Sequence, residues 1–449
     1  MVKAEELREQ LIELDKKHFI HPTSSLKQQH EQGAPFIFTK GEGVYLTDIT
    51  GKRVLEGMSS LWNVNIGYGR KELAEAAREQ MENLAFTNSF SSMSNEPAIR
   101  LAAKLAEIAP GNLDAVFFTS GGSESNDTAY KLVRYYWKLK GRPEKKKIIS
   151  RKKGYHGVNI GATSATGISP FQEMTTSHAP DFLHVEPSSS AALLECIDSE
   201  GAETIAAFIA EPIQGAGGVN MAPDGYFREV REICSKHNIL FIADEVITGF
   251  GRTGKMFACE HYRVVPDVML VAKGITSGYI PLGAVIVTDT IHRELIDLSQ
   301  GVLLHGYTYS GHPTACAVGL KNLEIMEREN LVENSRLMGE KLFEGLKEIE
   351  QEIEIVGEVR ALGLIGAVEV VHPTEKKRFS ELVAPKVSAE AAKRGLIVRT
   401  VGFEGMDTVV FAPPLVINEN EIKEMVAILK ASLKAVQESV LKETASEKS

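Results

Sequence analysis

Five short, almost uninterrupted apolar runs constrain the fold of this chain more than any other feature. They span residues 115–118, 205–210, 239–243, 268–272 and 284–287. Continuous hydrophobicity over so few residues is typical of strands that are covered on both faces. Between the second and third runs, Phe227, Val230 and Cys234 recur at helical spacing within residues 226–237. Because a strand–helix–strand unit joins parallel strands, the sequence predicts an α/β fold with a mostly parallel central sheet flanked by helices.

Both ends of the chain differ from this central pattern. Residues 354–371 alternate glycine with β-branched residues, as strands do, and residues 422–436 have the apolar spacing of a long amphipathic helix. We therefore expect residues 66–325 to form a large domain and residues 326–449 to form a small α+β domain. Residues 1–65 are expected to join the small domain and to reach the rim of the site.

Composition restricts the class of function. The formal charge of −10 at pH 7 argues against nucleic-acid binding, since proteins of that class usually present a basic face. No run approaches the roughly 20 apolar residues that a membrane-spanning helix needs, and residues 1–17 lack the apolar core of a signal peptide. The four cysteines are widely spaced without a CxxC motif. The sequence therefore predicts no metal site and no disulfide framework, and it favours a cytoplasmic location.

A polar residue comes at the end of four of the apolar runs: Ser120, Glu211, Asp244 and Lys273. Taken singly, a carboxylate such as Asp244 more often caps a helix, and a lysine is usually a solvated surface residue. Open α/β sheets, however, bind ligands at the carboxyl ends of their strands. Since four polar side chains there would be costly to bury without partners, their joint position predicts a ligand site.

The types of these residues indicate which ligand the site binds. Desolvation at the end of a buried strand would lower the pKa of Lys273 and leave a free amine that can form a Schiff base. Asp244, on a neighbouring strand, could hold a pyridine nitrogen protonated. The loop from Ser120 to Ser123 precedes a helical pattern, and its backbone N–H groups with the Ser123 hydroxyl could bind a phosphate. The residues therefore predict a site for pyridoxal 5′-phosphate.

The motifs around these positions resemble those of the class III (ω-) aminotransferases of fold type I. The similarity covers nearly the whole chain and follows the family order through Phe117–Asn126, Gly154–Gly157, Ala210–Pro212, Asp244–Gly254, Ala272–Gly274 and His305–Pro313. It implies a pyridoxal-phosphate-dependent transaminase whose cofactor is bound by residues 66–325. One departure is the phosphate loop, where the family commonly has Asn-Ser-Gly-Ser and this chain has Ser120-Gly121-Gly122-Ser123. The backbone donors remain, but which hydroxyls assist the phosphate is open.

The resemblance implies three catalytic residues. Lys273 matches the lysine that forms the Schiff base and then moves the proton between substrate and cofactor. Asp244 matches the partner of the pyridine nitrogen. Glu211 matches the acid that lies beside the Schiff base and the substrate.

The resemblance also implies a cofactor-binding set. Gly122 and Ser123 match the phosphate-binding pair, Tyr155 matches the aromatic residue stacked on the pyridine ring, and Val246 matches the residue on the other face of the ring. Thr308 matches a residue that reaches the phosphate of the neighbouring subunit, which implies a homodimer, or a tetramer, with shared active sites. Two alternatives stay open: Tyr155 could serve only as a packed aromatic residue of the core, and Thr308 could serve only as a turn residue.

Three further positions bear on the substrate. Trp62 matches a residue that lines the pocket of ω-amino-acid and amine:pyruvate transaminases, and Phe90 matches an aromatic contributed across the dimer. Arg399 matches an arginine that clamps a substrate carboxylate, a task that suits its bidentate geometry; the alternative is a structural ion pair. Together they favour an amine or ω-amino acid, such as taurine, β-alanine or 4-aminobutyrate, as donor and pyruvate as acceptor in a ping-pong reaction.

Two other reactions on the same fold stay open. The biotin-pathway enzyme that aminates 8-amino-7-oxononanoate with S-adenosylmethionine shares Gly57–Ser60, but it is expected to have two adjacent tryptophans where this chain has Leu61-Trp62. An aminomutase would retain its intermediate instead of releasing it. A purely binding role is disfavoured, because it would not explain a buried lysine facing a buried aspartate. The physiological donor, the enantiopreference and the choice between dimer and tetramer do not follow from the sequence.

Overall fold

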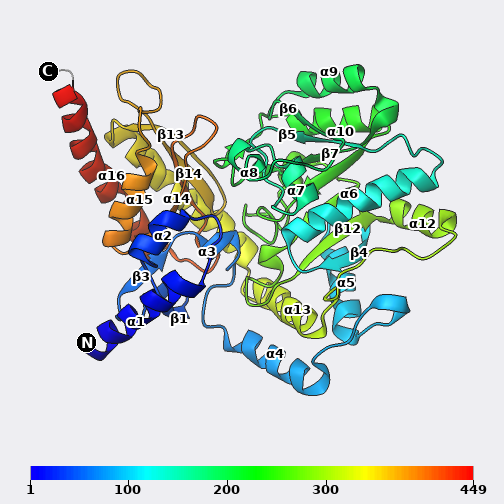
Figure 1. Cartoon of the computed structure of the whole chain (residues 1–449), viewed down its shortest axis with the longest axis horizontal. Helices are drawn as coiled ribbons and strands as arrows, with labels where there is room; N and C mark the ends of the chain where they lie inside the picture. The colour runs from blue at the N-terminus through cyan, green and yellow to red at the C-terminus, as the bar shows by residue number, and fades with distance from the viewer. Residues whose placement is uncertain (1, 448–449) are drawn as a thin grey trace.

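The computed structural model describes residues 2–447. In Figure 1 the middle of the chain, coloured cyan to yellow-green, surrounds a central sheet, and the blue N-terminal and orange to red C-terminal segments lie together beside it. The seven strands of this sheet have the order β4 (Leu113–Thr119), β12 (Gly283–Thr288), β11 (Val268–Val271), β10 (Leu240–Asp244), β7 (Ile205–Ala210), β5 (Lys147–Arg151) and β6 (Phe182–Val185). β12 runs antiparallel to β4 and β11, and the other neighbouring pairs are parallel. The α/β fold with a mostly parallel sheet is therefore confirmed.

Helices surround the central sheet and the smaller sheets. Those in the middle of the chain are α4 (Lys71–Leu84), α5 (Glu96–Ile108), α6 (Gly122–Leu139), α7 (Ile160–Ala165), α8 (Ser169–Gln172), α9 (Ser190–Glu200), α10 (Tyr226–Lys236), α11 (Cys259–Tyr262), α12 (Asp289–Leu298) and α13 (Pro313–Arg328). The two ends contribute α1 (Val2–His18), α2 (Leu26–Gln32), α3 (Ser59–Trp62), α14 (Leu331–Glu352), α15 (Ala384–Lys393) and α16 (Glu419–Glu447). All three predicted helical patterns are confirmed, in α6, in α10 and as part of α16. Within residues 2–447 no helix has the length and apolar character that crossing a membrane requires.

Covering helices explain why the central strands are almost wholly apolar. Ile242 of β10 packs into a core with Trp137 of α6, whereas its neighbour Phe241 packs into a second core with Phe227 of α10. Successive side chains of a strand point to opposite faces of the sheet. Because both faces are buried, no position along such a strand is free to be polar until the strand ends.

Two smaller sheets are built by strands from the ends of the chain, and a third lies within its middle part. One sheet has the order β1 (Phe38–Glu42), β2 (Tyr45–Asp48), β3 (Arg53–Glu56) and β15 (Leu396–Ile397); another has the order β13 (Val356–Leu362), β14 (Ile365–Val370), β17 (Thr408–Phe411) and β16 (Arg399–Val401); a third pairs β8 (Ile213–Gln214) with β9 (Asn220–Met221). β3 and β15 pair in parallel, with Leu55 opposite Leu396. This pairing supports the small domain that we propose from both ends of the chain. Helix α13 continues past residue 325, so it bridges the proposed boundary.

Candidate active site

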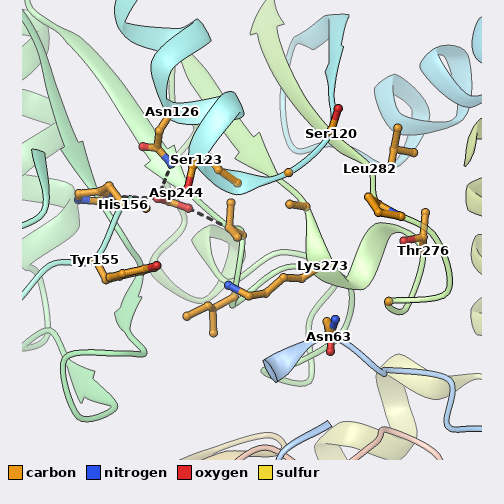
Figure 2. A pocket seen from close by; sticks show the side chains of 18 of the residues that line it. Asn63, Ser120, Ser123, Asn126, Tyr155, His156, Asp244, Lys273, Thr276 and Leu282 are labelled. Atoms are coloured by element: carbon orange, nitrogen blue, oxygen red, sulfur yellow. Dashed lines mark hydrogen bonds and ion pairs between the residues drawn. The ribbon is translucent and has the colours of Figure 1, made fainter. Parts of the chain in front are cut away.

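A cavity of about 320 Å³ opens beyond the carboxyl ends of the central strands. Figure 2 shows side chains from β10, from the turn after β11 and from the start of α6 converging on it. Seven of the predicted site residues line it: Gly122, Ser123, Tyr155, Glu211, Asp244, Val246 and Lys273. The topology therefore brings the predicted lysine, acids and glycine-rich loop to one place, as ligand binding at the edge of an open α/β sheet requires.

Lys273 follows β11, and its side chain points into the cavity (Figure 2). Burial removes water from around the amine and lowers the pKa of Lys273 to about 8, although the carboxylates of Asp244 and Glu211 oppose this shift. An amine with this pKa is partly neutral near neutral pH. It can therefore act as a nucleophile toward a carbonyl carbon.

Asp244 ends β10 and is buried. Its Oδ2 accepts hydrogen bonds from Nδ1 of His156 at 2.8 Å and from Nδ2 of Asn126 at 3.2 Å, and its Oδ1 accepts from the N–H of Val246 at 3.1 Å. Because a carboxylate only accepts, Nδ1 of His156 carries the proton in this contact. Three donors thus fix the orientation of a carboxylate at the cavity wall, as Figure 2 shows for two of them.

Glu211 follows β7 and is also buried. Its carboxylate accepts the N–H of Tyr155 at 2.9 Å and the N–H of Gly215 at 3.1 Å. Burial raises the pKa of Glu211 to about 7, and the Asp244 carboxylate acts in the same direction against the opposing effect of His156. A carboxyl group with this pKa can hold or release a proton near neutral pH.

The N-terminus of α6 opens onto the same cavity. The N–H groups of Gly122 and Ser123 have no protein acceptor within residues 2–447. The hydroxyl of Ser123 accepts the N–H of Val158 at 3.1 Å, which holds the loop after Gly157 against the helix start. Free first-turn N–H groups and the positive end of a helix dipole together bind anions. This end of the cavity therefore suits a phosphate.

Gly121 and Gly122 differ in the room that they leave for a side chain. A Cβ on Gly122 would lie 2.9 Å from Cγ1 of Val246, whereas a Cβ on Gly121 would have no atom within 4 Å. We expect Gly122→Ala to push Val246 into the cavity and to weaken pyridoxal phosphate binding on the order of tenfold. The matched control, Gly121→Ala, should bind within about threefold of the parent. Equilibrium dialysis measures both affinities, and equal affinities of the two variants would contradict this prediction.

Trp62 and Arg399 contact each other outside the lining of the cavity. The guanidinium carbon of Arg399 lies 5.2 Å from the centroid of the Trp62 ring, within the range of a cation–π contact. Arg399 has no carboxylate partner within 4 Å among residues 2–447, so the structure gives the ion-pair alternative no support. Burial lowers the pKa of Arg399, and its charge contributes to the lowered pKa of Lys273. The charge of the Arg399 guanidinium therefore acts on the Lys273 amine in the cavity.

Phe90 and Thr308 lie apart from this chain's own cavity. Both are exposed, Phe90 with 49% of its surface, and the segments that carry them are neighbours, since a Cβ on Gly306 would lie 3.0 Å from Cζ of Phe90. The structure therefore does not bring these two predicted residues to the site of the same chain. Their proposed role across a dimer stays a prediction.

Known proteins resemble this chain over almost its whole length. A family model described as aminotransferase class-III matches residues 26–433. The chain belongs to the class-III aminotransferases. It is therefore a transaminase of fold type I, as the sequence motifs predicted.

Three relatives illustrate how closely the aminotransferase resembles characterised members. The putrescine–pyruvate aminotransferase of Pseudomonas aeruginosa is 40% identical over 447 residues, which cover 95% of this chain and 96% of the relative. A solved transaminase from the marine bacterium Virgibacillus has a TM-score of 0.95 and 54% identity, covering 96% of this chain and 100% of that one. The ω-transaminase from Pseudomonas jessenii in complex with PMP has a TM-score of 0.92 and 40% identity, covering 96% and 99%.

The aminotransferase site also contains residues to which the sequence reasoning assigned no role. His156 and Asn126 bond the Asp244 carboxylate, and Asn63 lines the cavity from the N-terminal segment. His156 stands in the Gly154–Gly157 motif, so its position was available as a signal. Asn126 likewise ends the Phe117–Asn126 motif, but the motif did not indicate that its side chain bonds Asp244, because that contact joins a helix to a strand far away in the chain.

Proposed function

We propose that this aminotransferase binds pyridoxal 5′-phosphate covalently at Lys273 and transfers an amino group from an amine or ω-amino acid to pyruvate by a ping-pong mechanism. The observation that carries the proposal is a lysine with a pKa of about 8 in one cavity with an oriented carboxylate and the free N–H groups of a helix N-terminus. The amine fits the aldehyde of that cofactor, the carboxylate fits its ring nitrogen, and the N–H groups fit its phosphate. The solved relative in complex with PMP, the amino form of the cofactor, supports the same reading.

Each residue has a defined task in this proposal. The cofactor supplies an electron-poor pyridine ring and an aldehyde that exchanges for the substrate's amino group. Asp244, oriented by His156 and Asn126, keeps a proton on the ring nitrogen. Gly122 and Ser123 would bind the phosphate, and Tyr155 and Val246, which line the same cavity, would lie against the two faces of the ring.

Lys273 and Glu211 are the proton-carrying groups of the proposed site. Once the amino group of the substrate has displaced it from the cofactor, the free amine of Lys273 would take a proton from the reacting carbon of the substrate and return it, a task for which a lowered pKa is favourable. The carboxyl group of Glu211, with a pKa of about 7, exchanges protons beside it. Burial of both groups keeps bulk water from competing for these protons.

The substrate class rests on the relatives and on Arg399. The Pseudomonas aeruginosa relative is named for putrescine and pyruvate, a donor without a carboxylate and an acceptor with one. A guanidinium without a carboxylate partner, stacked on Trp62, is available to bind the acceptor's carboxylate. When an amine donor binds, Ile247, which lines the cavity and packs in one apolar cluster with Trp62, offers an apolar surface for a carbon chain.

A donor panel tests the proposed function. Purified holoenzyme is assayed with pyruvate and putrescine, β-alanine, 4-aminobutyrate, taurine or an arylalkyl amine, and alanine formation is measured. A parallel arm supplies S-adenosylmethionine with 8-amino-7-oxononanoate. Alanine formation with an amine or ω-amino acid is the expected result; turnover only in the parallel arm, or isomerisation of the donor without alanine formation, would overturn the proposal.

Arg399→Ala separates the two half-reactions. We expect the KM for pyruvate to rise on the order of tenfold or more, because the carboxylate loses a charge-assisted partner that contributes roughly 1.5–3 kcal/mol. The half-reaction with an arylalkyl amine, which has no carboxylate, should change far less. Stopped-flow absorbance measures each half-reaction separately. An equal loss in both, accompanied by a lower Tm, would indicate a structural arginine instead.

We also propose a homodimer with shared active sites. Exposed apolar side chains gather on two neighbouring segments, where the rings of Phe86 and Tyr309 lie 5.9 Å apart; they include Phe86, Phe90, Met93, Val302, Leu304 and Tyr309. A contiguous apolar surface of this kind is typical of an interface. It carries Phe90 and Thr308, the two residues that lie outside this chain's own cavity. Sedimentation of the holoenzyme tests the proposal, and a monomer at micromolar concentration would contradict it.

A cytoplasmic location is part of the same proposal. The four cysteines are unpaired, and three of them are buried in the core. Thiols of this kind suit a reducing compartment.

A further inference from the structure

The turn that carries Lys273 has a costly backbone conformation. Lys273 has a φ of +48°, Ser277 has a φ of +51°, and Gly278 has a φ of +75°. Side chains other than glycine rarely adopt this left-handed region, and such residues persist only when the surroundings hold them. The turn is also tightly packed, since a Cβ on Gly274 would lie 2.6 Å from Nδ2 of Asn65. Some group must therefore stabilise this turn against relaxation.

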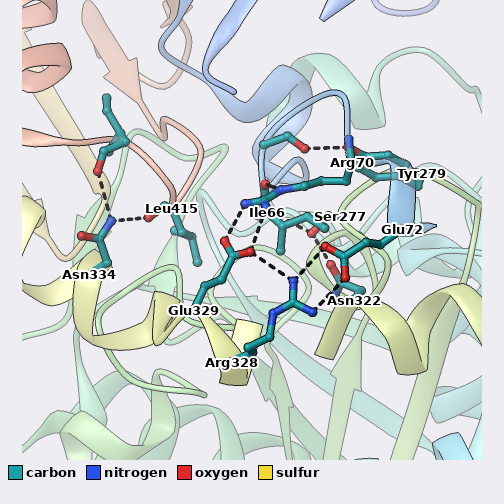
Figure 3. A network of polar contacts seen from close by, with 12 residues as sticks. Ile66, Arg70, Glu72, Ser277, Tyr279, Asn322, Arg328, Glu329, Asn334 and Leu415 are labelled. Atoms are coloured by element: carbon teal, nitrogen blue, oxygen red, sulfur yellow. Dashed lines mark hydrogen bonds and ion pairs between the residues drawn. The ribbon is translucent and has the colours of Figure 1, made fainter. Parts of the chain in front are cut away.

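Asn322 of α13 meets that requirement. Its side chain is fully buried, and its Nδ2 donates to the carbonyl oxygens of Gly274 at 2.9 Å and Ile275 at 3.0 Å. Its Oδ1 accepts the hydroxyl of Ser277 at 2.6 Å. Both protons of the amide are thus used on the turn that begins at Lys273. Figure 3 shows Asn322 next to Ser277 in this network.

The helix that carries Asn322 is itself held in place. The hydroxyl oxygen of Ser277 accepts the N–H of Ile66 at 3.2 Å, and the C-terminal end of α13 bonds residues shortly after Ile66. There Glu329 receives two hydrogen bonds from Arg70, at 2.8 and 2.7 Å, and Arg328 makes two to Glu72, both at 2.8 Å (Figure 3). The position of Asn322 is therefore set by the contacts of α13 and not by the conformation of the turn.

We infer that Asn322 is a positioning residue for Lys273, holding the turn so that the amine projects into the cavity at the angle that proton transfer needs. The inference rests on the proposed function of Lys273. Without the Asn322 amide, the carbonyl of Ile275 loses the bond from Nδ2, and the carbonyl of Gly274 keeps the 3.3 Å bond from the N–H of Ser277 but not the one from Nδ2. The turn then relaxes to recover hydrogen bonds. The amine at its start then moves, although no atom of Asn322 lies in the cavity lining.

Asn334 offers a matched control. It lies on α14, and its Nδ2 also donates to two backbone carbonyls, those of Leu415 at 2.6 Å and Ile417 at 3.0 Å. Figure 3 shows this pair apart from the Asn322 network. Asn322→Ala and Asn334→Ala therefore delete the same atoms and the same two amide-to-carbonyl hydrogen bonds, and Asn322→Ala also removes the acceptor of the Ser277 hydroxyl. Only the first deletion touches the Lys273 turn.

The test compares the two variants as holoenzymes. For Asn322→Ala we expect the rate constant of the amine half-reaction to fall on the order of tenfold, with the donor's dissociation constant within about threefold of the parent. The pH midpoint of the visible cofactor absorbance should shift by about half a unit or more. Asn334→Ala should lower Tm and leave both readouts at parental values.

The possible outcomes separate this inference from the proposed function. If the parent shows no visible absorbance and no response to amines, the proposed function fails, whatever the variants do. If the parent responds but Asn322→Ala behaves like Asn334→Ala, Asn322 is only structural and the inference is overturned. If Asn322→Ala does not fold, Ser277→Ala replaces it in the test, because it deletes a single hydroxyl of the same network. A smaller change in the rate constant and in the pH midpoint, in the same direction, supports the inference. Parental values of both overturn it.

Discussion

Lys273→Ala is expected to abolish amino transfer, with a loss of at least about a thousandfold, because in the proposed function one amine both binds the cofactor and moves the proton between substrate and cofactor. The visible absorbance of the lysine-bound cofactor should disappear. Noncovalent binding should persist, since the α6 N-terminus and Asp244 are unchanged. Turnover of alanine formation and the absorbance spectrum of the purified variant measure the two effects. Near-normal transamination would refute the assignment of Lys273.

Lys145 provides the control for this variant. It is also buried, and desolvation likewise lowers the pKa of Lys145 to about 8. Its Nζ, however, donates to the carbonyl of Ala202 at 2.9 Å, and it does not line the cavity. We expect Lys145→Ala to lower Tm while the visible absorbance stays. Loss of the absorbance in both variants would mean that the spectrum reports overall folding and not a bond to Lys273.

Asp244→Asn is expected to lower turnover about a hundredfold or more with a smaller loss of cofactor affinity. The amide keeps the shape of the carboxylate but lacks the charge that, in the proposed function, holds the ring nitrogen protonated, whereas the proposed phosphate contacts of α6 are unchanged. Single-turnover kinetics with an amine donor measure the first effect, and dialysis of the cofactor measures the second. Parental turnover in the asparagine variant would exclude the proposed role of Asp244 toward the ring.

Asp267→Asn is the matched control for the charge change. Asp267 directly precedes β11, at the opposite edge of the sheet from the cavity, and its Oδ2 accepts from Arg231 and from the N–H of Phe241, each at 2.7 Å. Its replacement removes a partly buried carboxylate without touching the site. We expect a lower Tm and unchanged single-turnover kinetics.

The central sheet was predictable because its physical cause is local. A strand covered on both faces must be apolar at every position, so five strands could be predicted from short apolar runs. The polar residues that follow four of these runs marked the edge of the sheet where the cavity lies. The direction of β12 was not predictable in the same way. The apolar side chains of β12 can be buried on both faces of the sheet whether the strand runs parallel or antiparallel to β4 and β11. Its direction depends only on the path of the connecting chain.

The candidate site was predictable where a motif lies within one segment and not where a contact joins distant segments. Lys273, Asp244 and the loop from Gly122 follow strands or begin a helix, so their positions could be anticipated from local pattern. The bonds from Asn322 to the carbonyls of Gly274 and Ile275 join α13 to a turn nearly fifty positions earlier. An asparagine in the middle of a helix carries no signal of such a partner, because its hydrogen bonds depend on helix packing.

The parallel pairing of β3 with β15 has a consequence for how the chain matures during synthesis. Leu55 leaves the ribosome early, whereas its partner Leu396 follows only after the whole central sheet has been made. Domains generally fold as they emerge, so the central sheet can assemble while β3 still presents an unpaired edge. Closing so long a loop is slow. We therefore expect nascent chains halted before residue 396 to aggregate through the N-terminal strands, and chaperone demand to be greatest just before the last strands emerge.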